Sequence, residues 1–126
     1  MHKGCVYITQ RQPDPPFITE INLSKSSLAK HMSVSRNSVK AWHKIAYLMI
    51  RTYREQFPLL NPNNPIAGRN TEVFFTPYQC WVIGRIRWVM RCYRNYDVAK
   101  LYIKQNLHLF SEDKFLSIFN EFKGVA

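Results

Sequence analysis

Residues 24–45 constrain the fold of this chain more than any other segment, because they carry the spacing of two short helices joined by a tight turn. Two helices that cross at a wide angle need a small residue where they touch and apolar residues that hold them together. Ala29 is that small residue, and Ser33 occupies the turn position where glycine would avoid a steric penalty. The inward positions are all apolar: Leu28, Met32, Val34, Val39 and Trp42. The pattern predicts a helix-turn-helix, with helices that start at the N-caps Ser24 and Ser35.

Length and composition indicate one domain with a small appendage. The chain has 126 residues, of which 46% are hydrophobic, enough for a packed core. No apolar run approaches the roughly 18–20 residues that span a bilayer. The N-terminus lacks the apolar segment and small-residue cleavage site of a secretory signal. We therefore expect a cytoplasmic protein without a membrane span.

Neither a metal site nor catalytic machinery is indicated by the residue types that carry such chemistry. The cysteines Cys5, Cys80 and Cys92 are odd in number and form no CxxC pair, which suits reduced thiols. The four histidines do not combine with them at zinc-like spacing. The eight acidic residues form no motif that would hold a metal pair, and nucleophile and phosphate-loop motifs are lacking. We expect no metal, no cofactor and no enzymatic activity, against the alternative of a small nuclease or transposase fragment.

The net charge of +10 is unevenly distributed along the chain. Residues 1–60 hold nine basic and three acidic residues (9 − 3 = +6), and residues 61–94 hold five and one (5 − 1 = +4). Residues 95–126 hold four of each and are neutral. The basic stretch 1–94 favours contact with a polyanion, and the neutral stretch 95–126 favours contact with protein. The alternative is a basic protein that its charge merely keeps in solution.

The remaining elements make the predicted fold class mainly α. A strand or surface arm is expected at 5–10, and the run 36–57 is either one long helix or a helix that breaks near Lys44. The turn-rich segment 58–70 and a strand at 72–75 predict a small β wing. Thr76, Pro77 and Gln79 are typical of a capped helix start, so a helix should run from 77 to about 94.

The last third predicts a C-terminal helical hairpin, with helices near 96–108 and 112–122. Ser111 is the expected N-cap of the second helix. This hairpin carries more apolar residues than it can hide alone, so they should pack on the front part or on a second copy of the chain. We assign 1–94 to a DNA-binding domain with an N-terminal arm, and 95–126 to a dimerisation element.

The order of helix-turn-helix, wing and capped helix resembles the DNA-binding domain of MerR-type regulators. The likeness is carried by LAKHMSVSRNSVKAWHKI at 28–45 and VFFTPYQCWVIGRIRWV at 73–89. The chain departs from the family at Ser33 and in the wing signature, and it lacks the long C-terminal coiled coil. In layout it is most similar to the short, effector-less MerR-type repressors, such as those encoded beside CRISPR-associated transposons. The resemblance implies a winged helix-turn-helix regulator with no small-molecule effector.

A helix-turn-helix places the N-terminal half of its second helix against base edges in the major groove. Arg36 would pair with guanine and Asn37 with adenine, whereas Lys40 and Lys44 suit phosphates. The start of the first helix suits backbone phosphates. Arg69 should be exposed by its turn and reach a flanking groove. The complete set of predicted DNA-binding residues is Lys25, Ser26, Ser27, Ser35, Arg36, Asn37, Lys40, Lys44 and Arg69.

Other side chains have less specific interpretations. Arg87, Arg91 and Arg94 lie beside one another on the predicted 77–94 helix, either as a solvated face or as a phosphate-contact ridge. Trp81 and Trp88 fall at the edge of that helix and are expected to be partly exposed, with a dimer contact or a ligand pocket as the alternative. His31 and His43 are expected to face solvent.

The predicted function is sequence-specific DNA binding by a transcription regulator. We expect a nucleoid-associated repressor that binds an inverted-repeat operator as a homodimer, because two copies related by a two-fold axis gain in effective concentration. One alternative is an accessory factor that bends DNA for recombination or excision of a mobile element. A protein–protein adaptor is the other.

Overall fold

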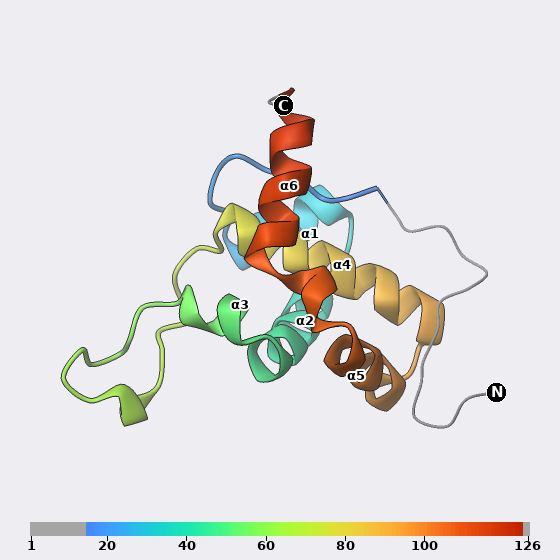
Figure 1. Cartoon of the computed structure of the whole chain (residues 1–126). Coiled ribbons are helices and arrows are strands. Elements are labelled where there is room, and N and C mark those ends of the chain that lie inside the picture. The colour runs from blue at the N-terminus through green and yellow to red at the C-terminus, as the bar shows by residue number, and fades with distance from the viewer. Residues whose placement is uncertain (1–14, 125–126) are drawn as a thin grey trace.

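The structure, a computed structural model, describes residues 15–124. This part of the chain is mainly helical, as predicted, and its helices surround one hydrophobic core (Figure 1). In chain order the elements are α1 (Lys25–Met32), α2 (Arg36–Met49), α3 (Arg51–Glu55), the 3₁₀-helix η1 (Pro65–Ala67), α4 (Pro77–Tyr93), α5 (Tyr96–Gln105), the 3₁₀-helix η2 (Leu107–Phe110) and α6 (Glu112–Phe122). The strand predicted at 5–10 lies outside the described residues.

α1 and α2 begin at the predicted N-caps. The hydroxyls of Ser24 and Ser35 each accept a hydrogen bond of 3.1 Å from the backbone N–H three residues later. Between the helices Ser33 is left-handed, with φ 56° and ψ 44°, and its turn is closed by a 3.0 Å bond from the Val34 N–H to the Ala29 carbonyl. The predicted inward residues Leu28, Ala29, Met32 and Val39 are buried, and Val34 and Trp42 are partly buried against them.

Replacing Ser33 with glycine is expected to stabilise the protein. A side chain in the left-handed region costs about 1–2 kcal/mol, more than the roughly 0.5–1 kcal/mol that glycine adds to the entropy cost of folding. The free energy of unfolding, measured by urea denaturation, should rise by about 0.5–1 kcal/mol. Ser26→Gly, at an exposed position within α1, should lower it instead. Destabilisation by both substitutions would contradict the left-handed turn.

The run 36–57 is broken, but at Ile50 rather than near Lys44. Ile50 is buried and extended (φ −119°, ψ 104°). The helix breaks here although the run 36–57 contains neither glycine nor proline. The Arg54 guanidinium donates a 2.8 Å hydrogen bond to the Tyr47 carbonyl. This bond satisfies an acceptor that the end of α2 leaves free. The buried, extended Ile50 therefore ends α2, and α3 starts immediately after it.

α4 begins with the predicted capping box. The Gln79 N–H donates to Thr76 Oγ1 at 3.2 Å, and the Thr76 N–H donates to Gln79 Oε1 at 2.8 Å. The helix ends at Tyr93, where Arg94 adopts a left-handed conformation with φ 54°. Both boundaries agree with the predicted helix.

The expectation that Trp81 and Trp88 are partly exposed is wrong. Their exposed fractions are 0% and 8%. α4 lies in the middle of the molecule and packs against α2, α3, α5 and α6 (Figure 1). A helix that is covered on several sides has no single inward face, so its apolar periodicity identifies only part of what is buried.

The two C-terminal helices form near the predicted ranges. They pack onto the preceding helices of the same chain, which is one of the two predicted outcomes. α5 lies against α4 and α2, and α6 lies against α4 and η2. Ile103, Phe110 and Phe115 are buried in the same core as α1 and α2. Other apolar side chains of this region stay exposed, namely Leu101, Leu107, Leu116 and Phe122.

The predicted β wing is not formed within residues 15–124. Of the expected strand at 72–75, only Phe75 pairs, through an isolated antiparallel bridge to Leu23. A second isolated bridge, Leu59 to Arg69, closes a loop that contains η1 and protrudes from the helices in Figure 1. The prolines of 58–70 lack the N–H that a ladder requires, so the turn-rich segment forms a loop instead of a hairpin.

Candidate nucleic-acid interface

The outer surface of α2 carries the central group of predicted DNA-binding residues. Arg36, Asn37, Lys40 and Lys44 are all exposed. The sequence contains no acidic residue between positions 20 and 55, so α1 and α2 contribute cations and no carboxylate to this surface. Such a surface attracts a polyanion.

Four of the predicted cations line one hollow of about 290 Å³, which we call the basic hollow. Lys25 comes from α1, and Arg36, Lys40 and Lys44 come from α2. The other lining residues are His43, Thr71 and Glu72. The hollow therefore collects positive charge from two helices, with one carboxylate at its rim.

Lys25 is held in place at this hollow. Its ammonium donates a 2.9 Å hydrogen bond to the Thr71 carbonyl and lies 5.5 Å from the centre of the Phe75 ring. Thr71 and Glu72 reach the hollow because Phe75 pairs with Leu23, just before α1. Sequence reasoning missed both residues, since no local pattern indicates this pairing.

The three predicted serines are placed differently in the structure. The Ser35 hydroxyl caps α2 and lies 3.0 Å from the Ser38 hydroxyl. The backbone of Ser27 completes the Ser24 cap, and its carbonyl lies 2.8 Å from His31 Nδ1. Ser26 is exposed at the first turn of α1.

Arg69 does not have the exposure that its turn context predicts. Its guanidinium donates hydrogen bonds to the carbonyls of Phe57 (2.7 Å) and Glu55 (3.2 Å), and the residue is partly buried. These bonds tie the base of the protruding loop to the end of α3. The geometry gives Arg69 a structural role, and it lies apart from the basic hollow.

Arg87 is likewise engaged within the protein. Its guanidinium donates a 2.9 Å hydrogen bond to the Met32 carbonyl at the end of α1. A cation there satisfies a terminal carbonyl and complements the helix dipole. Arg91 and Arg94 are exposed, whereas Arg87 is bound within the protein and does not extend the predicted arginine ridge.

His43 is buried, contrary to expectation, and lies beneath the basic surface. Its Nδ1 is 2.7 Å from the Tyr53 hydroxyl, and Phe57 and Phe75 surround the ring. Burial, reinforced by the charge of Lys25, lowers the pKa of His43 to about 4. The imidazole is therefore neutral at pH 7.

The Cys80 thiol is unreactive in character. Cys80 is buried, and this burial raises the pKa of its thiol to about 12, so it is a thiol and not a thiolate. Within the part of the chain that the structure describes, no three His, Cys, Asp or Glu side chains gather in a way that could hold a metal ion.

Among the described helices, none is both long and apolar enough to cross a membrane. Comparison of the chain with protein families, with curated proteins and with solved structures gave no match.

Proposed function

We propose that this protein binds double-stranded DNA through α2 and the start of α1, used as a helix-turn-helix. The observation that carries the proposal is the basic hollow, where Lys25, Arg36, Lys40 and Lys44 converge from two helices. The capped, left-handed turn between these helices supports the same proposal, because it holds them as one unit. Phosphate oxygens are the ligands that suit such a cluster of cations.

In this proposal α2 enters the major groove with its first turns against base edges. Arg36 and Asn37 are exposed there and carry the bidentate donor and acceptor groups that read guanine and adenine. Lys40 and Lys44 contact phosphates along the groove, and Lys25 contacts the backbone beside α1. Sequence is then read by two residues, and affinity comes mainly from three lysines.

We further propose that the protein is a transcription repressor of the MerR type. The resemblance of 28–45 and 73–89 to that family supports this proposal, and the arrangement of capped helices is compatible with it. A repressor needs only to occupy its operator. An operator in the form of an inverted repeat matches a homodimer.

α6 is the surface proposed for dimerisation. Leu116 and Phe122 are 49% and 62% exposed on it, although α6 is otherwise anchored through Phe115. Beside Leu116, a hollow of about 240 Å³ runs between α6 and the start of α4. Light scattering after size-exclusion chromatography at tens of micromolar should give the mass of a dimer, and Leu116→Glu should give that of a monomer. A monomeric parent protein would contradict this interface.

The proposed function is tested by fluorescence anisotropy on DNA taken from directly upstream of the protein's own gene. A scrambled duplex is the control, and both are titrated across a salt series. Preference for the upstream DNA at physiological salt is the expected result. Equal and salt-labile binding to both duplexes would indicate a non-specific or architectural DNA binder. Absence of binding at low salt would exclude the proposal.

A further inference from the structure

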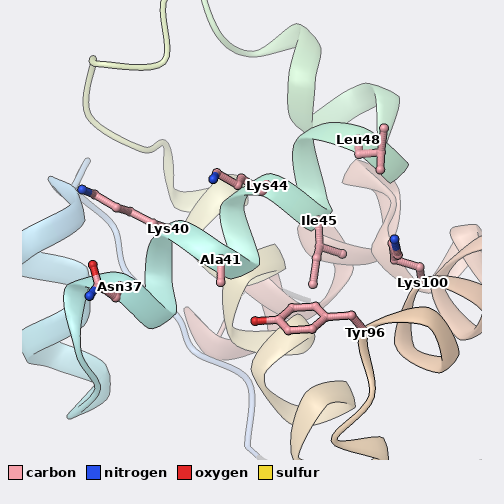
Figure 2. Close-up of a pocket in the computed structure, with 8 residues that line it drawn as sticks. All are labelled: Asn37, Lys40, Ala41, Lys44, Ile45, Leu48, Tyr96 and Lys100. Atoms are coloured by element: carbon pink, nitrogen blue, oxygen red, sulfur yellow. The ribbon is translucent and has the colours of Figure 1, made fainter.

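A second hollow, on the other side of α2, has an apolar floor. It has a volume of about 530 Å³ and lies between α2 and the start of α5 (Figure 2). The Tyr96 ring lies across from Ala41 and Ile45, and Leu48 continues the apolar surface along α2 (Figure 2). Tyr96 is 50% and Leu48 is 64% exposed, so the apolar surface is in contact with water. Covering such surface is favourable, because it removes apolar area from water.

The rim of this hollow is polar and positively charged. Lys100 of α5 points its ammonium towards Leu48 at one end, and Asn37 lies at the other end (Figure 2). Lys40 and Lys44 project along the α2 edge. None of the lining residues is acidic, and the ion pair between Lys100 and Asp97, at 3.7 Å, is solvent-exposed and weak.

We propose that this α2–α5 hollow binds a small organic anion with an aromatic or alkyl body, such as a carboxylate. The apolar body covers Leu48 and stacks beside Tyr96, while the carboxylate accepts from the Lys100 ammonium. The volume lies within the range of about 300–1,000 Å³ typical of small-molecule sites. Apolar floor and cationic rim together select an amphipathic anion over a neutral or cationic compound.

Such a ligand also regulates DNA binding, a consequence that rests on the proposed function. Asn37, Lys40 and Lys44 line this hollow and belong to the proposed DNA surface. A bound anion places negative charge beside the α2 cations that phosphates require, and it occupies space next to α2. Ligand and DNA therefore weaken each other's binding reciprocally, since coupling between two sites is symmetric. The compound acts as an inducer that releases the repressor.

The test measures binding of the probe 1-naphthoate to the full chain by amide NMR, in the absence of DNA. Shifts should concentrate at Ala41, Ile45 and Tyr96 and saturate with one dissociation constant, and neutral 1-naphthylmethanol should bind more weakly. Lys100→Gln should weaken naphthoate binding about fivefold, because a charge-assisted contact is lost. Lys104→Gln, at an exposed lysine one turn along α5, is the matched control. It should change the dissociation constant for naphthoate less than twofold.

A second pair of variants tests the apolar floor. Leu48→Asn should weaken naphthoate binding by a similar factor, whereas Ile66→Asn, at a 95% exposed position on the protruding loop, should have no effect. Equal effects of the site and control variants would overturn the proposal, as would shifts located elsewhere. Equal binding of naphthoate and the neutral alcohol would also overturn it.

Anisotropy with DNA then separates the two proposals. Naphthoate should raise the apparent dissociation constant for DNA in the parent protein and have less effect in Leu48→Asn. If the chain binds naphthoate at α2–α5 but no DNA, the proposed function fails and the ligand site stands. If it binds DNA but no naphthoate, the ligand site fails and the proposed function stands.

Discussion

Replacing Arg36 with alanine is expected to weaken binding to operator DNA by roughly 10–100-fold, because a good bidentate contact to guanine contributes about 1–3 kcal/mol of discrimination. Arg36 is exposed in the first turn of α2, where it can reach a base edge. Binding to a scrambled duplex should change much less. Anisotropy titrations on both duplexes at one salt concentration measure the ratio of the two affinities.

Lys40→Gln provides the contrasting result within the same surface. A phosphate contact carries no sequence information, so both duplexes should be bound more weakly by a similar factor. The slope of log K against log salt should fall by about 0.9 for the lost contact. Lys104→Gln removes the same charge from an exposed position on α5 and should leave both quantities nearly unchanged. Equal effects of Lys40→Gln and Lys104→Gln would show that only net charge matters and would contradict the assignment of α2.

Acidification from pH 6.5 to pH 4 is expected to destabilise the protein through His43. Its pKa is about 4 in the folded protein, against 6.5 for an unperturbed imidazole, so the unfolded chain binds more protons in this window. The free energy of unfolding therefore falls as the pH falls from 6.5 to 4. The stability that the neutral His43 imidazole contributes is fully lost below about pH 4. The complete effect is about 3 kcal/mol, taking 1.36 kcal/mol per unit of pKa.

Urea denaturation at several pH values measures this effect when His43→Gln is compared with the parent protein. Glutamine does not titrate, so the difference in free energy of unfolding between the two should shrink or reverse as the pH falls from 6.5 to 4. Carboxylates that titrate in this range contribute to both proteins and largely cancel. A constant difference for His43→Gln would contradict the buried, neutral imidazole.

Helix starts were predictable because a cap is a local interaction. Ser24, Ser35, Thr76 and Ser111 each bond to a backbone N–H three residues later, so the residues that decide the boundary are close in the sequence. The break at Ile50 was not predictable in this way. It depends on how the segment after α2 turns back into the core, which no local residue specifies.

The candidate surface was predictable in its composition but not in its arrangement. Exposed cations on α2 follow from helical periodicity, and the structure places Lys25 beside them. Arg69 and His43 were misassigned because their partners lie elsewhere: a carbonyl at Phe57, and a hydroxyl at Tyr53 across the α2–α3 break. Turn context and helix phase contain no information about such partners.

The sequence by itself therefore determined a mainly helical protein, the caps that start its helices, and a basic outer surface on α2. These properties depend on hydrogen bonds and periodicities within a few residues. Only the tertiary structure decided that a loop replaces the wing, that α4 is covered on several sides, and that Tyr96 faces Ala41 across the α2–α5 hollow. These features depend on contacts between distant segments, and such contacts form only where burial of apolar surface brings the segments together.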